Sequence, residues 1–318
     1  MRTAYFIIPP GVQLLDVTGP AHIFYEAGEY GAEVELIYVS MSQDDTHSFS
    51  TAGLHFQKLV SFQYCQPSTQ DWIFVPGLET SLVDDAAFVQ AHKPFFDWLL
   101  TNSDNAIKVC SVCTGAYLLG LAGLLENRSC TTHWKYIDHF QHRFPSAEVL
   151  DDRLFVKSGN IYSSAGVSSG IDLALFLLDE AYGPLFATKV AKEVVVFLRR
   201  SESDPQLSVF LKFRNHIDNR IHEVQDFIAQ HLESKNSVDE LAEHVHMSPR
   251  NLTRSFKKAT GITIGGYLEK LRLERAVYLL SEGQKVDAVA ASIGLSSNQL
   301  RSLLTQNQLG LPSQMSRS

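Results

Sequence analysis

The first two hundred residues alternate between short strand-like runs and longer helix-like runs, and this alternation limits the folds that the chain can adopt. The strand-like runs are rich in β-branched and aromatic residues and end at Gly, Pro or Ser: AYFIIP, VELIYVS, DWIFVPG and KVCSVC. Helix-like runs such as DDAAFVQAHKPFFDWLLTN and SSGIDLALFLLDEAYG lie between or after them. Strands that alternate with helices predict a flavodoxin-like α/β fold, with a parallel sheet covered by helices on both faces.

The alternation of strand-like and helix-like runs ends before the last third of the chain. The last strand-like segment, RLFVKSGNIYSSAG, predicts two strands joined at residues 158–160 as an antiparallel pair. After about Ile217 only helix-like runs follow, separated by short breaks. The polar, proline-containing stretch 200–215 separates the two patterns. We therefore expect an α/β domain over 1–200, a linker over 201–216, an all-α domain over 217–310 and a tail over 311–318.

Charge is divided unevenly between these parts. From Arg220 onward there are 12 Lys and Arg against 10 Asp and Glu, a net charge of +2, whereas the rest of the chain carries −10. An acidic body does not attract DNA, while a basic tail can. No apolar run approaches the roughly 18 residues of a membrane span, and the N-terminus lacks the features of an export signal. Four cysteines in 318 residues are not a disulfide framework, so we expect a cytoplasmic protein.

Residues 237–260 have the spacing of a helix-turn-helix. SVDELAEHV places apolar residues on one helix face, and Ser248 with Pro249 then gives a strong start signal for a second helix. In that helix Leu252 and Phe256 face inward. Five polar residues face outward and are candidate DNA contacts: Arg250, Thr253, Arg254, Lys257 and Lys258. Arginine side chains are suited to guanine edges and lysine side chains to phosphates. From spacing alone, however, a helical bundle with a solvent-exposed basic face explains the same sequence equally well.

An internal repeat favours the DNA-binding interpretation. KVDAVAASIGLSSNQLRSLLTQNQLG repeats the scheme, with a turn at Gly294 and another helix beginning at Ser296 or Ser297. Over residues 221–310 the tail resembles the AraC family of transcription regulators, which implies two all-α helix-turn-helix units that enter successive major grooves. The resemblance places Arg250, Thr253 and Arg254 at base-reading positions.

The second unit departs from that family's pattern. In its second half, GLSSNQLRSLLTQNQLGLPS, Leu stands where the family has Phe, and Arg301 is the only basic residue. Because phosphate neutralisation supplies much of the affinity for DNA, we expect this unit to bind weakly. Its candidate DNA contacts are Asn298, Gln299 and Arg301.

In the α/β body, Cys113 lies where a predicted strand passes into a predicted helix. Ligands of open α/β sheets bind at the carboxyl ends of the strands, and a helix N-terminus is expected to lower the pKa of a thiol. The loop PPGVQLLDVTGP should bring Asp16 to the same edge. In VPGL, the N–H groups at Gly77 and Leu78 are expected to bind a carboxylate or an oxyanion.

The motifs VCTGAYLL, LLDVTGP, TTHW and SSAGVSSGIDLAL give the body a resemblance to the class I glutamine-amidotransferase-like superfamily, in its PfpI protease and isonitrile hydratase branch. The resemblance covers about residues 3–196. Together with the AraC-like tail, it resembles the GlxA type of transcription regulator. The protease branch has a His after the Cys, where this chain has Thr114. The hydratase pattern is reproduced by Asp16, Cys113 and Thr114.

We interpret the chain as a transcription regulator, a homodimer that binds promoter DNA and senses a small, nitrogen-containing metabolite without a cofactor or a metal. The candidate ligand contacts are Asp16, Gly77, Leu78, Cys113, Thr114, His133 and Ser164. One alternative is a cysteine-dependent hydratase or amidase that uses Asp16, Cys113 and Thr114. Another is a regulator whose body only dimerises. A redox pair of Cys110 with Cys113, or a metal site of His133, His139 and His142, is less favoured, because Cys110 should lie inside a strand and the histidines on a wet helix face.

Overall fold

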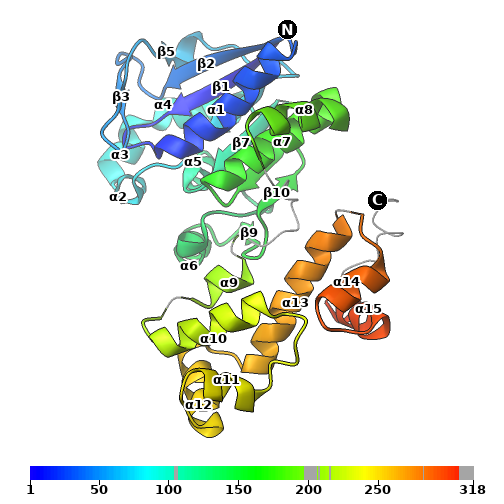
Figure 1. Ribbon diagram of the computed structural model, residues 1–318. Coiled ribbons are helices and arrows are strands. Elements are labelled where there is room, and N and C mark those ends of the chain that lie inside the picture. Colours follow the sequence, from blue (N-terminus) through cyan, green and yellow to red (C-terminus); the bar gives the residue numbers. More distant parts are fainter. Residues whose placement is uncertain (104–106, 197–205, 207, 215, 282, 308–318) are drawn as a thin grey trace. The chain divides into compact units, whose positions relative to one another are not determined.

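The computed structural model describes residues 1–103, 107–196, 206, 208–214, 216–281 and 283–307. The chain forms two compact units, residues 1–206 and 207–318 (Figure 1). Part of the expected linker over 201–216, all of the expected tail over 311–318 and the last few residues of both expected domains lie outside the described residues.

A seven-stranded sheet forms the centre of the first unit, with the strand order β10-β11-β7-β6-β1-β2-β5. Its strands are β1 (Arg2–Ile8), β2 (Val34–Ser40), β5 (Val60–Ser61), β6 (Trp72–Val75), β7 (Lys108–Val112), β10 (Phe155–Ser158) and β11 (Ile161–Ser164). All neighbouring strands are parallel except β10 and β11, which form the expected antiparallel pair. All four residues of β6 are buried, as in a parallel sheet between two helical layers.

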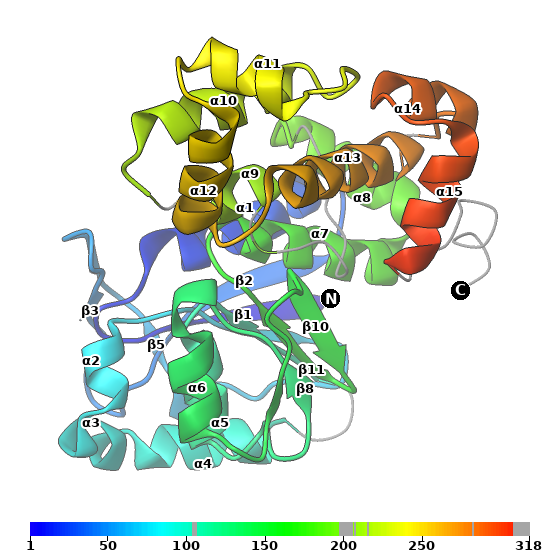
Figure 2. The ribbon, with the colours of Figure 1, turned by 90° about the horizontal axis from the view of Figure 1, so that it is seen from below.

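Helices cover both faces of this sheet, which confirms the expected α/β fold (Figure 2). On one face lie α1 (Leu14–Glu29), α7 (Ser168–Tyr182) and α8 (Pro184–Glu193). On the other lie α2 (Thr80–Val83), α3 (Ala86–Ala91), α4 (Lys93–Thr101), α5 (Gly115–Leu121) and α6 (Ile137–Arg143). Side chains along β1 alternate between the two cores, with Phe6 and Ile8 in the first and Tyr5 and Ile7 in the second.

The first helix begins earlier than the sequence pattern indicates. We expected it over GPAHIFYEAGEY, but it begins at Leu14 and contains Pro20. An apolar stripe that includes Val17 and Phe24 is buried, and its burial offsets the hydrogen bond that Pro20 cannot donate. Asp16 therefore lies in the first turn of a helix and not in a loop.

A second correction concerns the run after Asp84, which we expected as one helix. It is divided into α3 and α4 at His92. Pro94 lacks the N–H that would continue α3, and instead it lies in the first turn of α4, where no such donor is needed.

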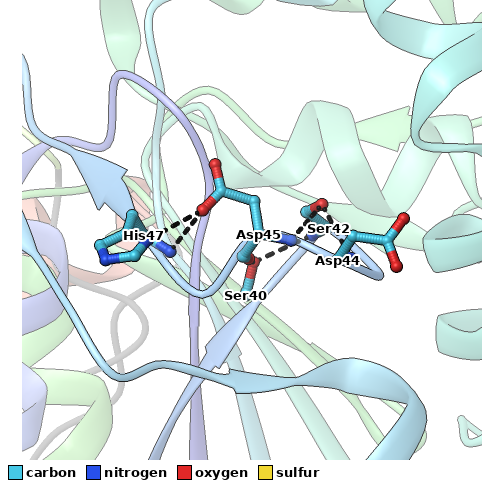
Figure 3. A network of polar contacts seen from close by, with 5 residues as sticks. All are labelled: Ser40, Ser42, Asp44, Asp45 and His47. Carbon is cyan, nitrogen blue, oxygen red and sulfur yellow. Dashed lines mark hydrogen bonds and ion pairs between the residues drawn. The ribbon is translucent and has the colours of Figure 1, made fainter.

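Short segments that the sequence pattern did not indicate border the sheet. They are β3 (Ser48–Phe49), β4 (His55–Phe56), β8 (Ser129–Cys130), β9 (Glu148–Val149) and the 3₁₀ turns η1 (Phe62–Tyr64) and η2 (Trp134–Tyr136). Between β2 and β3 the loop is held by its own hydrogen bonds (Figure 3). Ser40 Oγ donates to the carbonyl oxygen of Asp45 (2.6 Å), and the Asp45 carboxylate accepts from the N–H of His47 (2.9 Å). These bonds join near neighbours in sequence, so they order the loop.

The described part of the second unit contains helices and no strand. They are α9 (Val209–Lys212), α10 (Asn219–Gln230), α11 (Val238–His244), α12 (Pro249–Thr260), α13 (Ile264–Ser281), α14 (Val286–Ser292) and α15 (Ser297–Gln306). Two separate cores hold them: the first half of α13 packs with α10 to α12, and its second half packs with α14 and α15. Over the described residues of the whole chain, no helix is both long and apolar enough to cross a membrane.

Candidate functional site

Cys113 forms the elbow between β7 and α5, as the sequence predicts. Its φ is +59°, its N–H donates to the carbonyl oxygen of Ser164 on β11 (3.0 Å), and only 6% of the residue is exposed. A β-carbon on Gly115, two residues later, would lie 2.0 Å from the carbonyl oxygen of Val75. Because any larger residue would clash with that backbone, the elbow depends on this glycine.

Asp16 joins three segments around the elbow. It is 1% exposed, and its Oδ1 accepts from the N–H of Val167 (2.8 Å) while its Oδ2 accepts from the N–H of Gly77 (3.1 Å). The Cys113 side chain is close enough to this carboxylate for each group to shift the pKa of the other. Burial raises the pKa of Asp16, and the hydrogen bonds from Val167 and Gly77 and the nearby Cys113 thiol only partly oppose that effect.

The expected activation of the thiol is not found. Burial raises the pKa of Cys113 well above its usual value, and the negative charge of Asp16 raises it further. Both effects outweigh the hydrogen bonds from Thr114, which lower this pKa. At neutral pH the thiol is therefore protonated, and it can donate its hydrogen to the Asp16 carboxylate.

The backbone donors expected to receive a ligand carboxylate are already engaged. Gly77 N–H is bonded to Asp16, and Leu78 N–H donates to Thr114 Oγ1 (3.0 Å). The Thr114 hydroxyl in turn donates to the carbonyl oxygen of Leu78 (3.0 Å). Both N–H groups therefore already have partners within the protein, and a carboxylate or an oxyanion could bind them only by displacing Asp16 or Thr114.

The remaining two predicted ligand contacts differ in position. Ser164 is fully buried beside the elbow, and its Oγ donates to the carbonyl oxygen of Ser111 (3.3 Å). His133 is half-buried and lies against the rings of Trp134 and Tyr136. Its Nδ1 accepts from the N–H of Lys135 (3.3 Å), and burial lowers its pKa. The structure therefore gathers Asp16, Gly77, Leu78, Cys113, Thr114 and Ser164 at one sheet edge, and places His133 in the adjacent segment.

Several residues of this site were not identified from the sequence. Val167 has a φ of +52°, which is strained for a β-branched residue, and it is held there by Asp16. A β-carbon on Gly166 would lie 2.5 Å from that of Cys113. Thr132 Oγ1 donates to the carbonyl oxygen of Cys113 (2.9 Å). Gly166 in SSAGVSSG was the sequence signal for this part of the site, since such a glycine often marks a close approach of two backbone segments.

The alternative cysteine and histidine sites receive little support. Cys110 lies fully buried inside β7, as expected, and all four cysteines are unpaired. Nδ1 of His139 is bonded to the hydroxyl of Tyr117 (2.7 Å), while His142 is exposed. Among the described residues, no three His, Cys, Asp or Glu side chains are grouped so as to hold a metal ion.

The helix-turn-helix over residues 237–260 is present, and Ser248 caps its second helix as predicted. Ser237 and Glu240 form a capping box on α11, and Ser248 Oγ accepts from the N–H of Asn251 at the start of α12. Leu252 and Phe256 are fully buried in the first core of the second unit. The turn and the second helix therefore have fixed directions relative to α11.

The outer face of α12 is basic. A shallow groove on it is lined by Pro249, Arg250, Thr253, Arg254, Lys257 and Lys258. The Thr253 hydroxyl donates to the carbonyl oxygen of Pro249 (2.9 Å), and Arg254 Nη2 donates to Oδ1 of Asn251 (3.2 Å). All five predicted contacts are exposed, so the structure brings them together on one helix face.

The corresponding face of α15 carries fewer charged side chains than that of α12. Asn298 and Arg301 are exposed, but the side-chain oxygen of Gln299 accepts from both N–H and Oγ of Ser296 (2.8 and 2.9 Å). This capping box begins the helix after Ser296 and engages one of the three predicted contacts.

Comparison with known proteins matches both halves of the chain. Residues 2–180 match the DJ-1/PfpI family, and residues 241–310 match a helix-turn-helix domain. The HTH-type transcriptional regulator CdhR of Pseudomonas aeruginosa is 28% identical over 281 residues, which cover 87% of this chain and 80% of that protein. Isonitrile hydratase of Pseudomonas putida is 33% identical over 180 residues, or 56% of this chain and 71% of that protein. The crystal structure of a THiJ/PfpI family protein from Pseudomonas syringae, 23% identical, has a TM-score of 0.50 over 65% of this chain and 78% of that one, and shows the same fold.

Proposed function

The chain belongs to the DJ-1/PfpI family, and from that membership together with its helix-turn-helix domain we propose a sequence-specific DNA-binding transcription regulator whose N-terminal unit senses a small metabolite. The exposed basic face of α12, on a capped helix-turn-helix, is the observation that carries the proposal. The similarity to the regulator CdhR extends over both units and supports it.

We assign base reading to the N-terminal part of α12. Arg250 and Arg254 lie one turn apart on the exposed face, and a bidentate Arg–guanine pair discriminates by about 1–3 kcal/mol. Lys257 and Lys258 lie a turn further along and suit phosphates. Asn298, Gln299 and Arg301 of α15 are proposed as a weaker second contact, because they bring a single positive charge.

The test is selection of genomic DNA fragments by the purified full chain, at two salt concentrations. Arg254→Ala is expected to weaken binding to the selected fragments and to relax their base preference, because it removes a base contact and leaves the fold intact. The matched control is Arg220→Ala, an exposed arginine on α10 outside the α12 face. If wild type retains no fragment at low salt, or if the two variants behave alike, the assignment is wrong.

We further propose that the regulator acts in the cytoplasm as a homodimer. Two copies related by a two-fold axis require two inverted half-sites in the DNA. Footprinting of the selected fragments should reveal that symmetry, and a single uninterrupted site protected by one copy would contradict it.

The proposed metabolite site is the edge around Asp16 and Cys113. Since the N–H groups of Gly77 and Leu78 are engaged, a ligand that donates hydrogen bonds to Asp16, such as a cationic nitrogen group, suits this site better than a carboxylate. Cys113→Ser is expected to abolish the promoter response while DNA affinity is retained. An unchanged response would favour the alternative in which the N-terminal unit only dimerises. The engaged donors and the burial of this site also agree with that alternative.

A hydratase is the second candidate, with Asp16, Cys113 and Thr114 as its residues. The proximity of Asp16 to Cys113 and the similarity to isonitrile hydratase favour it. The protonated, buried thiol argues against a nucleophile in this state. Turnover of an isonitrile by wild type that disappears in both Cys113→Ala and Asp16→Ala would establish the enzyme, and no turnover would exclude this activity.

A further inference from the structure

The second unit contains a first helix-turn-helix (α11 and α12) and a second one (α14 and α15), and the cores of the two meet at the middle of α13 (Figure 1). Leu271 of α13 lies in the core formed with α10 to α12, whereas Leu273 packs against the core of α14 and α15. Because the two clusters of side chains are separate, their packing alone does not hold the two motifs at one angle.

Arg272, between those two leucines, fastens α13 to the loop that joins α10 to α11. Its Nε donates to the carbonyl oxygen of Leu232 (3.0 Å), and its Nη2 donates to that of Ser234 (2.8 Å). Asn236 holds the same loop from within. It is 5% exposed, and its Nδ2 donates to the carbonyl oxygens of His231 (2.6 Å) and Ser234 (3.1 Å). The backbone of the α10–α11 loop is therefore held at a defined place on α13.

The turn of the second helix-turn-helix lies directly against this loop. A β-carbon on Gly294, between α14 and α15, would lie 2.7 Å from the carbonyl carbon of Glu233 and closer still to its oxygen. It would also lie 3.0 Å from Nη2 of Arg272. Gly294 has a φ of +69°, which favours glycine as well. A residue without a side chain thus brings the backbone of the second motif against the backbone of a loop from the first.

This contact is a second connection between the two motifs, in addition to the shared helix. Two connections at different points resist a rotation that one connection permits. The angle matters for DNA binding because α12 and α15 carry the proposed contacts. Two helices that enter successive major grooves must be held about 34 Å apart, in an orientation that matches the turn of the DNA.

We propose that the contact of Gly294 with the α10–α11 loop determines the spacing of the two DNA segments that one copy of the chain reads. This inference rests on the proposed function. It makes Gly294 and Arg272 specificity-determining residues, although neither belongs to the predicted DNA contacts on α12 and α15.

Two variants of the full chain remove the contact in different ways. In Gly294→Ala the added methyl group meets the backbone of Glu233, while Arg272→Met keeps most of the length of the side chain and lacks its donors. The matched control is Gly283→Ala. Gly283 also has a positive φ, +79°, and among the described residues no atom lies within 4 Å of its β-carbon position. Both glycine variants incur similar backbone strain, so their difference reports the contact. Thermal unfolding confirms that each variant is folded.

The first measurement needs no DNA. Spin labels on Glu243→Cys of α11 and Ser302→Cys of α15, both exposed positions, report the distance between the two motifs. The four native cysteines are buried, so labelling is directed to the two new ones. We expect one narrow distance distribution in the otherwise unchanged chain and in the Gly283→Ala control. Gly294→Ala and Arg272→Met should shift or broaden it. A folded Gly294→Ala variant with the unchanged distribution would overturn the proposal.

The second measurement compares a DNA fragment retained by wild type with the same fragment lengthened by one base pair between the two segments that one copy protects. The insertion moves these segments about 3.4 Å apart and rotates one against the other by about a tenth of a turn. We expect it to weaken binding of wild type and of the control by about tenfold, and of Gly294→Ala and Arg272→Met by less than about threefold, since only a rigid pair of motifs requires one spacing.

Protection of a single segment by each wild-type copy, or an equal effect of the insertion on wild type and both variants, would overturn the proposal. If wild type retains no DNA fragment, the proposed function fails. The distance distributions still decide, in that case, whether the contact of Gly294 fixes the two motifs relative to each other.

Discussion

Gly115 sets how closely the Cys113 elbow approaches the end of β6. There is no room for a side chain beside the carbonyl oxygen of Val75, and Gly166 faces Cys113 at similarly short range. Cys113 and Val167 both have positive φ, a conformation that costs roughly 1–3 kcal/mol at a non-glycine residue. The surrounding hydrogen bonds, especially those of Asp16, hold this strained arrangement in place.

Replacing Gly115 by Ala should therefore destabilise the first unit severely. We expect the free energy of unfolding to fall by about 3 kcal/mol or more, since the clash is with rigid backbone. Gly28→Ala is the control, because this helical glycine in α1 has open space around it and alanine should add about 0.5–1 kcal/mol. Chemical denaturation measures both values. Equal stability of the two variants would show that the elbow can relax.

The charge of Asp16 should control the titration of Cys113. In Asp16→Asn the negative charge is absent, so the pKa of the thiol should fall and the thiolate should form at lower pH. The midpoint of the pH dependence of Cys113 alkylation, followed by mass spectrometry, measures this shift. Burial slows the reaction in wild type and variant alike, so the midpoint and not the rate is compared. An unchanged or higher midpoint would contradict the assigned role of Asp16.

At the scale of the elements, a cluster of partly buried charged residues joins α7 to the sheet. Glu180 on α7 accepts from Lys108 of β7 (2.7 Å), from Lys157 of β10 (2.5 Å) and from the hydroxyl of Tyr162 on β11 (3.1 Å). Burial opposes ionisation of Glu180, but the bonds from the two lysines outweigh it and hold its pKa below the usual value. One carboxylate therefore fastens a helix to three neighbouring strands.

This cluster should make stability depend on pH on the acid side. Because the pKa of Glu180 is lower in the folded state, its contribution is complete above the unfolded value near 4.5 and is lost as the pH falls through the folded value. Glu180→Gln should lower the free energy of unfolding by about 1–2 kcal/mol at pH 7, allowing for the partly exposed lysines. The difference from wild type should shrink below pH 4.5. A difference that stays constant down to pH 3 would show that the loss is not electrostatic.

Elements with a clear period were predictable, and the long-range bonds that build the site were not. The four main strands follow from alternation, and α11 and α12 follow from the apolar stripe and from the start signal at Ser248. The capping box at Ser237 was not predicted. By contrast, the bond of Asp16 to Val167 spans 151 residues. No local pattern reveals such a pair, or the engagement of Thr114 with Leu78 that closes the expected anion site.

At the scale of the whole molecule, charge should control association with DNA. Each phosphate that a lysine neutralises adds about one to the slope of log affinity against log salt concentration. Lys257→Ala should therefore reduce that slope by about one and weaken binding equally across sequences. Lys189→Ala, an exposed residue of α8 in the acidic first unit, is the control. A Lys257→Ala variant with the wild-type slope would exclude a phosphate contact.

Among the described residues, α13 is the one helix that contributes to both cores of the second unit. A substitution in the core of α14 and α15 therefore touches none of the side chains that pack α12. In evolutionary terms, the two helix-turn-helix units can change at different rates. A lineage can lose base contacts in the second unit while the first continues to recognise its operator, and the single arginine on α15 is what such divergence would leave behind.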